Sequence, residues 1–428
     1  MQSGKDLEVG MGDAINRGSH MSAASSSPLS QRSPLPPLGI YLHWPFCVAI
    51  CPYCDFNVHL ARDITQNAAE TDWLNAYAAE LTYAHGLRPE GPVETVFFGG
   101  GTPSLMPASL VGAILQKIDQ LWGLAADAEI SLEANPNSAA KPHMQDLRAA
   151  GVTRLSLGAQ AFDDAALKKL GRTHNAADAQ KAFGDAQAVF ARASFDLIYA
   201  RPGQSLAEWH SELSKALALG PQHMSLYQLT IEPETPYARL QAAGKLIVPH
   251  EDVAADMYEV TQDLCAAAGL PAYEISNHAA PGHACRHNMA SWQGGDYIGI
   301  GPGAHGRLTP TQSHSQIDTQ KAGNTRLATQ ARRVPQDWLT HVACDTHGWQ
   351  EVKNLSVDEA RMEAVMLGLR LVSGVSLDAL GARGVILDTA KIDAARQDGL
   401  LANDPMHLQA SPQGRLLLDT LIARLLLD

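Results

Sequence analysis

Short apolar runs alternate with longer amphipathic segments from Leu38 onward, and this alternation restricts the fold more than any other feature of the sequence. The runs have the length of strands, and the segments between them repeat apolar residues with the helical period. Strands are expected at 39–43, 95–98, 129–133, 154–157, 195–198 and 224–229, and helices at 105–121, 142–150, 176–190 and 206–219. Because a helix-length segment follows each strand, the pattern predicts βα units around a parallel sheet. Such units build either an open doubly wound sheet or a full or partial barrel.

The first 37 residues do not share this pattern. Gly18-Ser19-His20-Met21 has the form of an expression-vector scar, and the stretch that follows is rich in Ser and Pro. We therefore predict a disordered leader over 1–37, consisting of an expression tag and a Ser/Pro-rich tract. The main domain is expected over 38–308.

The pattern changes again after the main domain. Residues 309–333 are polar and rich in His, Thr and Gln, so we expect 309–355 to form an exposed connection. Residues 356–428 return to a helical period, with a short hairpin expected around Ser411-Pro412-Gln413-Gly414. Its helices are expected at 358–371, 377–380, 389–398 and 416–427, and the hairpin strands at 407–410 and 414–417. Helices with a hairpin predict a winged-helix-like domain, and the alternative is a plain helical cap on the main domain.

Charge and hydropathy exclude several classes of protein. The chain of 428 residues carries 32 Lys and Arg against 45 Asp and Glu, a net charge of −13. This balance argues against binding to nucleic acid, which needs a basic surface, and gives no support to a polybasic membrane contact. The sequence shows neither an apolar run of roughly 18 residues nor a leader of signal-peptide form. We expect a cytoplasmic protein with no membrane-spanning segment.

Three of the six cysteines lie within eight residues, as Cys47, Cys51 and Cys54, while Cys265, Cys285 and Cys344 are scattered. A disulfide framework is typical of small secreted domains without a core, whereas 45% of this chain is apolar. The cysteines therefore indicate a reducing compartment and a metal or cluster site.

The spacing C-x3-C-x2-C places three thiolates on one loop. A four-iron cluster needs four ligands, so three cysteines leave one iron open to an outside molecule. Zinc is the alternative, with His59 as its fourth ligand, although structural zinc usually takes two distant ligand pairs. A third alternative is three buried structural cysteines. Covalent c-type haem attachment is excluded, because Asp55 rather than His follows Cys54.

This motif, placed after the first strand, resembles that of the radical S-adenosylmethionine (radical SAM) superfamily. There the open iron is chelated by the methionine part of SAM, and an electron from the cluster breaks the C–S bond to give a 5′-deoxyadenosyl radical. The surrounding sequence resembles the oxygen-independent coproporphyrinogen III oxidase-like family, in particular its haem chaperone branch. The resemblance covers roughly Leu38 to the C-terminus. It implies an α/β fold, a partial (β/α)6 radical SAM barrel with a C-terminal helical, winged-helix-like domain.

Polar and glycine residues follow several of the expected strands. Gly99-Gly100-Gly101-Thr102-Pro103 lies between a strand and a helix, where glycines let backbone amides approach an anionic ligand. Glu133, Gln160 and Asp196 lie at strands whose carboxyl ends would face the ligand-bearing rim, although rim side chains also serve as caps and salt bridges. The resemblance implies SAM contacts at Tyr41, Tyr53, Gly100, Gly101, Thr102, Glu133, Gln160, Arg172 and Asp196, and further family positions fall on Thr230 and His305.

A second motif lies near the end of the main domain. His287, Asn288 and Trp292 match most of a His-Asn-x-x-Tyr-Trp pattern that is associated with haem binding in the chaperone branch, and Ser291 replaces its tyrosine. Imidazole is the commonest axial ligand of haem iron. The haem candidates are therefore His287, Asn288, Trp292 and His305, with His278 and His283 also close in sequence. The alternative for His287 is a hydrogen-bonded loop histidine.

Phe56 bears on the choice of function within the family. In the oxidases a further cysteine lies two residues after the third, and here that position is Phe56, as in the chaperone branch. The resemblance implies an iron–sulfur protein that binds haem as cargo and delivers it to haem-dependent proteins. The alternatives are anaerobic oxidative decarboxylation of coproporphyrinogen III and a radical SAM methyltransferase or haem-degrading relative. The resemblance implies haem-accepting proteins as partners and, if SAM is cleaved, an electron donor. It is also compatible with a homodimer.

Overall fold

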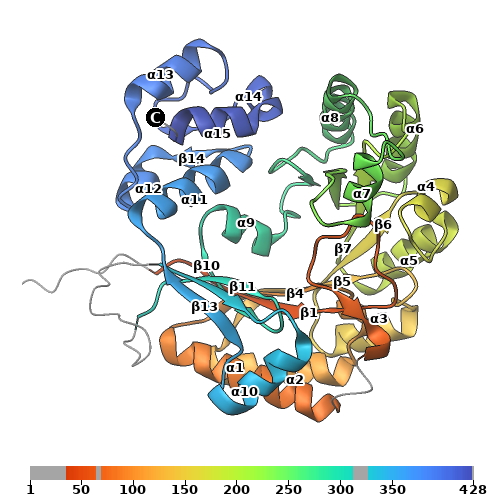
Figure 1. Cartoon of the computed structure of the whole chain (residues 1–428), viewed down its shortest axis with the longest axis vertical. Coiled ribbons are helices and arrows are strands. Elements are labelled where there is room, and N and C mark those ends of the chain that lie inside the picture. Colours follow the sequence, from red (N-terminus) through yellow and green to blue (C-terminus); the bar gives the residue numbers. More distant parts are fainter. Residues whose placement is uncertain (1–34, 64–68, 312–325, 427–428) are drawn as a thin grey trace, which may run out of the picture. The chain divides into compact units, whose positions relative to one another are not determined.

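The main domain is built on one open, mostly parallel sheet (Figure 1). The computed structural model describes residues 35–63, 69–311 and 326–426, so the leader expected at 1–37 lies outside the described residues except for 35–37. The six expected strands are β1 (Leu38–Trp44), β4 (Val93–Gly100), β5 (Leu124–Ala134), β6 (Arg154–Gln160), β7 (Arg192–Tyr199) and β8 (His223–Gln228). The expected helices are α2 (Ala108–Trp122), α3 (Lys141–Ala149), α5 (Ala176–Val189) and α6 (Leu206–Leu217).

The sheet continues beyond these strands at both ends. β9 (Asn277–Ala279) pairs antiparallel with β8, and β10 (Asp296–Ile300) pairs parallel with β1. β11 (His305–Leu308), β12 (Leu327–Ala331) and β13 (Trp349–Asn354) follow as antiparallel neighbours. The resulting eleven-stranded order is β13-β12-β11-β10-β1-β4-β5-β6-β7-β8-β9. Because the order ends on two different strands, the sheet stays open, and the expected partial barrel is confirmed.

Helices connect the parallel strands, and side-chain caps fix where several of them begin. The Ser205 side chain accepts from the Glu208 amide at the start of α6, and Asn175 does the same for Asp178 in α5. The other elements of this domain are α1 (Glu70–Leu87), α4 (Asp164–Lys169), α7 (Pro236–Ala242), α8 (Glu251–Ala267), α9 (Arg286–Trp292), α10 (Pro335–Asp345), β2 (Phe46–Cys47), β3 (His59–Leu60) and the 3-10 turns Ala61–Asp63 and Pro103–Leu105. In Figure 1, α1, α2 and α10 lie on one side of the sheet and α9 on the other. None of the described helices is long and apolar enough to cross a membrane.

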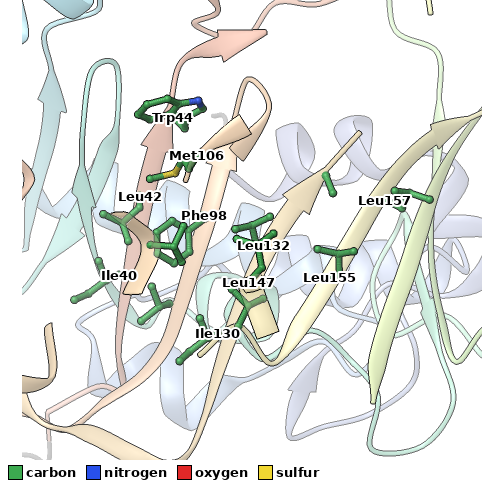
Figure 2. Close-up of a cluster of buried hydrophobic side chains, with 14 of the residues drawn as sticks. Ile40, Leu42, Trp44, Phe98, Met106, Ile130, Leu132, Leu147, Leu155 and Leu157 are labelled. Atoms are coloured by element: carbon green, nitrogen blue, oxygen red, sulfur yellow. The ribbon is translucent and has the colours of Figure 1, made fainter. Parts of the chain in front are cut away.

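The pleat of the strands separates the core from the site. Figure 2 shows a cluster of buried apolar side chains to which the strands of the sheet contribute. They include Ile40, Leu42, Phe98, Ile130, Leu132, Leu155 and Leu157, with Met106 and Leu147 packed against them. Successive side chains of a strand point to opposite faces, so the residues between these, such as Tyr41 and Glu133, point to the other face of the sheet. That face carries the polar groups described below.

The exposed connection expected at 309–355 has to be corrected for its described part. Residues 326–355 contain β12, α10 and β13, which extend the main sheet. Leu327 and Ala331 are fully buried in β12, and the Trp338 ring of α10 stacks on Trp73 at a centroid distance of 5.9 Å. The alternation of apolar and polar residues in β12 is short and lies in a polar sequence, so the periodicity of the sequence did not predict this strand.

The C-terminal domain has its own core. α11 (Val357–Arg370), α12 (Leu377–Ala382), α13 (Thr389–Gln397) and α15 (Leu418–Leu426) correspond to the expected helices. Val365, Leu369, Leu380, Ile392, Leu408 and Leu421 form a hydrophobic cluster that is separate from that of the main domain. This C-terminal domain was expected from the sequence.

The hairpin expected within this domain is wrong. β15 (His407–Leu408) pairs with β14 (Val375–Ser376) rather than with residues 414–417, which belong to α14 (Pro412–Leu416) and to the turn after it. Ser411 caps α14 by accepting from the Gly414 amide at 2.9 Å, and Pro412 occupies the first helical position. A Ser-Pro pair of this kind begins a helix as readily as it forms a turn.

Candidate functional site

Two adjoining cavities lie at the polar face of the sheet, and they share Asp55, Phe56, Gly100 and Glu133 as wall residues. The cysteine cavity, of ≈ 620 Å³, is lined by Cys47, Cys51 and Cys54. The histidine cavity, of ≈ 560 Å³, is lined by His43, His287 and His305. Both volumes lie in the range of small-molecule and cofactor sites.

The cysteine loop follows β1 and is held by contacts to distant strands. The Cys54 amide donates to the Cys51 carbonyl at 3.1 Å, which closes a turn between them. The Thr102 hydroxyl donates to Cys47 Sγ and Arg172 Nη1 to Cys51 Sγ, both at 3.4 Å. The Thr102 hydrogen bond favours the thiolate form of Cys47, the form that binds metal.

Burial acts in the opposite direction on two thiols of this loop, Cys47 and Cys54. It raises the pKa of Cys47, and it raises the pKa of Cys54 to about 11. Thiols of this kind stay protonated until a metal replaces the proton. Among the described residues, no group of three or more His, Cys, Asp or Glu is arranged to hold a single metal ion. Three cysteines around one cavity fit an iron–sulfur cluster, in which each thiolate binds a different iron.

The glycine loop after β4 holds the cysteine loop in place. Gly100 has φ +113°, and a Cβ there would come within 2.6 Å of His43 Cε1. The Gly101 and Thr102 amides donate to the carbonyls of Trp44 at 2.7 Å and Phe46 at 2.9 Å, and the Gly100 amide donates to Glu133 Oε2 at 3.1 Å. These three amides therefore donate to groups of the protein itself. The glycines allow β4 to approach β1 and the cysteine loop closely.

Two carboxyl groups point into the cysteine cavity from neighbouring parts of the sheet. Glu133 lies on β5 and Asp196 on β7, and burial raises the pKa of both, that of Glu133 to about 8. The proximity of Asp196 also raises the pKa of Glu133. Ser156 Oγ donates to Asp196 Oδ1 at 3.3 Å. The pair can bind hydroxyl or ammonium groups of a ligand that fills the cavity.

Gln160 has a strained backbone at the edge of the same cavity. Its φ of +68° lies in the left-handed region, which is rare for a residue with a side chain. Arg172 contacts the same segment, since its Nη2 donates to the Gly158 carbonyl at 2.9 Å. Strain of this kind persists where the surrounding structure enforces it, and it is common at binding sites.

The structure places the predicted SAM positions in one cavity, except for Tyr41 and the additional position His305. Tyr53, Gly100, Gly101, Thr102, Glu133, Gln160, Arg172, Asp196 and the additional Thr230 all line the cysteine cavity. Tyr41 instead lines the histidine cavity, where its hydroxyl hydrogen-bonds His43 Nδ1 at 3.0 Å. His59 lies on β3 and lines neither cavity.

His287 is a buried imidazole in the wall of the histidine cavity. It lies on α9, its Nδ1 hydrogen-bonds Thr95 Oγ1 at 2.9 Å, and its ring lies 5.2 Å from that of Phe97. Burial lowers the pKa of His287 to about 4, so the ring is neutral at pH 7. Because Nδ1 is bound to Thr95, Nε2 is the nitrogen that can ligate iron.

The other members of the second motif are not all brought together. Ser291 lies one helical turn after His287 and lines the same cavity, and so does the exposed His305 on β11. Asn288 and Trp292 line neither cavity. The Trp292 ring instead packs under the Arg370 guanidinium of α11, at 4.6 Å. Residues at i and i+4 share one face of a helix, which explains why His287 and Ser291 separate from the remaining members.

Two further histidines considered from the sequence lie elsewhere. His278 is fully buried on β9, where its Nε2 hydrogen-bonds Gln262 Nε2 at 3.3 Å. His283 precedes α9. Neither histidine lines the histidine cavity.

Sequence reasoning missed several wall residues. Asn135 and Tyr227 line the cysteine cavity, and His43, Asn57 and Arg333 line the histidine cavity. The two-residue period could have found His43, two residues after Tyr41, and Asn135, two after Glu133. Asn57 and Arg333 lie in loops, where no periodic signal exists.

Two protein-family models match the chain, one in the main domain and one in the C-terminal domain. The model of the radical SAM superfamily matches residues 41–215, and that of the HemN C-terminal domain matches residues 355–417. The solved structure of coproporphyrinogen III oxidase (HemN) from Escherichia coli has a TM-score of 0.73 at 20% identity and covers 92% of this chain and 91% of that one. This likeness shows a shared fold.

Relatives of known sequence match over most of their length. Heme chaperone HemW of Mycobacterium tuberculosis is 36% identical over 92% of this chain and 96% of its own length. Heme chaperone HemW of Escherichia coli is 42% identical over 64% of this chain and 71% of its own. Radical S-adenosyl methionine domain-containing protein 1, mitochondrial, of Mus musculus is 37% identical over 90% of this chain and 87% of its own length. The chain therefore belongs to the radical SAM superfamily and, within its coproporphyrinogen III oxidase-like family, to the HemW branch.

Proposed function

We propose that this protein binds a four-iron, four-sulfur cluster and SAM in the cysteine cavity and carries haem in the histidine cavity, for delivery to haem-dependent proteins. Cys47, Cys51 and Cys54 would hold three irons, and the Glu133 and Asp196 carboxyl groups would bind polar groups of SAM. Cluster and SAM together supply reductive cleavage of a C–S bond. Thr102 and Arg172 donate hydrogen bonds to Cys47 Sγ and Cys51 Sγ, which orient these two sulfur atoms.

The observation that carries the haem part is that His287 and His305 line one cavity beside the cysteine cavity. His287 offers a neutral ring whose Nδ1 is fixed by Thr95, an arrangement that orients a metal-ligating imidazole. Relatives named Heme chaperone HemW, which match this chain over most of their length, support the same assignment.

Phe56 favours a carrier over an oxidase. It lines both cavities and is 63% exposed, at the position where the oxidases have a further cysteine. An aromatic ring can pack against a planar ligand but cannot ligate iron or donate a thiol hydrogen. Decarboxylation of coproporphyrinogen III is the second candidate function, and it rests on the fold shared with the oxidase of Escherichia coli.

One experiment separates the two functions. The protein is purified without oxygen, reconstituted with iron and sulfide, and titrated with haem; a parallel sample receives coproporphyrinogen III, SAM and a reductant. We expect saturable haem uptake, seen in the Soret band, and no protoporphyrinogen. Turnover of the tetrapyrrole would refute the carrier function, and absence of any haem uptake would refute it independently.

We place the protein in the cytoplasm, because a cluster held by three cysteines requires reduced thiols. Haem-accepting proteins and an electron donor for SAM cleavage are the partners that this function needs. Size-exclusion chromatography with light scattering tests the homodimer that the resemblance allows.

A further inference from the structure

The histidine cavity has little fixed charge apart from Asp55 and Arg333. Burial lowers the pKa of His43 and His287 to about 4, and burial also lowers the pKa of His305, so these imidazoles are neutral at pH 7. Burial raises the pKa of Glu133 to about 8, which keeps this carboxyl largely protonated at that pH. Asp55 and Arg333 remain as the charged side chains of the cavity wall.

The backbone around Arg333 is held by two separate segments, the loop that carries Asn57 and the turn that carries Gly303. Asn57 Nδ2 donates to the Arg333 carbonyl at 2.8 Å and to the Pro302 carbonyl at 3.0 Å. The Gly303 amide donates to the Arg332 carbonyl at 2.8 Å. A Cβ at Gly303, whose φ is +83°, would collide with Asn57 Nδ2, so glycine is required for this approach. The Arg333 backbone is therefore fixed relative to His305 and the cysteine loop.

The guanidinium of Arg333, in contrast, is exposed and forms no hydrogen bond or ion pair with any residue that the structure describes. Its neighbours in the same sheet extension are engaged. Arg307 Nη2 pairs with Glu363 Oε1 at 2.6 Å, and Arg326 Nη2 donates to the Gly295 carbonyl at 2.5 Å. A fixed backbone with a free guanidinium at a cavity is the arrangement of a ligand-binding arginine rather than of a structural one.

We propose that Arg333 binds a carboxylate at the edge of the tetrapyrrole cargo and that Asn57 is the positioning residue that holds it there. This inference rests on the proposed function. Haem carries two propionates, and a planar guanidinium binds a carboxylate through two parallel hydrogen bonds. A carboxylate held by Arg333 would fix which edge of the ring stays near the mouth of the cavity. It would thereby orient the face of the ring toward His287 and His305.

The test changes the ligand and the residue together. The full-length, cluster-reconstituted protein is titrated with haem and with haem dimethyl ester, in which both carboxylates are blocked, and affinities are read from the Soret band. The wild type should bind haem about tenfold more tightly than the ester. In Arg333→Gln this preference should fall to about twofold or less. Without the guanidinium, the free carboxylates of haem no longer give it an advantage over the ester. Arg239→Gln removes an exposed arginine that lines neither cavity, and it should keep the wild-type preference.

Asn57→Asp is the matched test of positioning, since it keeps the shape of the side chain but removes both donated hydrogen bonds. We expect it to reduce the preference for haem over the ester while the iron content stays at the wild-type value. Equal affinity of the wild type for both ligands, or a full preference retained in Arg333→Gln, would overturn the inference and leave the haem carrier intact. Failure of the wild type to bind either ligand would instead overturn the proposed function.

Discussion

The cysteine cavity and the histidine cavity adjoin each other, but the chain builds them in different ways. The cysteine cavity is formed by one loop and by residues at the ends of consecutive parallel strands, such as Glu133, Gln160 and Asp196. The histidine cavity is formed by β1, the residues after Cys54, α9 and the strands β10 to β12 with the loop after them. A repeated βα unit brings its functional residues to one edge of the sheet, whereas an antiparallel extension brings together residues from unrelated segments.

The largest expected effect lies in the cysteine cavity. Cys51→Ala should remove the iron and the brown chromophore completely, because a cluster with two protein ligands is not retained. Cys344→Ala, which changes an exposed cysteine of α10, is the matched control and should keep the wild-type iron content. Iron and sulfide analysis of the reconstituted proteins measures the cluster content of both variants. A native protein with one tightly bound zinc would show that the radical SAM interpretation of this cavity is wrong.

The next effect concerns the sheet extension that carries the wall of the histidine cavity. Glu80 of α1 is fully buried and accepts from the Gly301 and Gly348 amides at 2.8 and 2.7 Å and from Trp338 Nε1 at 3.1 Å. Glu80→Gln replaces one acceptor oxygen by a donor, which should cost about 2–4 kcal/mol in the free energy of unfolding.

Glu259→Gln on the exposed face of α8 serves as the control and should change the free energy of unfolding by less than about 0.5 kcal/mol. Denaturant titration followed by tryptophan fluorescence measures both variants. Equal stability of the two variants would show that Glu80 does not hold the extension in place. We also expect Glu80→Gln to lose haem affinity more than iron, because the loop that begins at Gly301 leads into β11, which carries His305.

His287→Ala tests the ligand inside the histidine cavity. Loss of an iron–imidazole bond should shift the Soret band and weaken haem binding by about tenfold, as for the loss of one strong ligand interaction. His341→Ala changes a half-buried histidine of α10 that lines neither cavity, and it should leave the spectrum unchanged. An unchanged spectrum for His287→Ala together with a shifted one for His305→Ala would move the ligand to β11.

The smallest effect, when it is expressed per pH unit, is a pH dependence of stability in the ligand-free protein. Burial and the nearby Asp196 raise the pKa of Glu133 to about 8, above that of an unfolded carboxyl. The folded state therefore holds this proton more tightly, and the free energy of unfolding should fall as the pH rises from about 5 to 8, by on the order of 1 kcal/mol per unit. Glu133→Gln should show a shallower fall. Identical slopes for both proteins would mean that Glu133 is ionised in the folded state throughout this range.

The two cavities also differ in how well the sequence predicts them, because one is built from consecutive parallel strands and the other from unrelated segments. The six parallel strands, their helices and most of the cysteine cavity could be predicted, because the strand pattern and the C-x3-C-x2-C motif are local signals. The C-terminal helices could be predicted as well, but α14 could not, since Ser411-Pro412 suits a turn as well as a helix start.

The histidine cavity could be predicted only in part. His287 and His305 were candidates, but Trp292 lies against Arg370 instead, because its place on α9 depends on packing with the C-terminal domain. The role of the glycine loop also depends on contacts with Trp44 and Phe46 that no local pattern reveals. Arg333 and Asn57 reach the cavity through loops whose course is set by the tertiary structure alone.

The central claim is that two adjoining cavities perform separate tasks, and haem titration of the Cys51→Ala protein under anaerobic conditions tests it most directly. The account predicts that this variant, free of iron, still binds haem saturably at the wild-type stoichiometry and with a wild-type Soret maximum, because His287 and its Thr95 contact are untouched. Loss of haem binding together with the iron, in a variant that remains folded by circular dichroism, would contradict it.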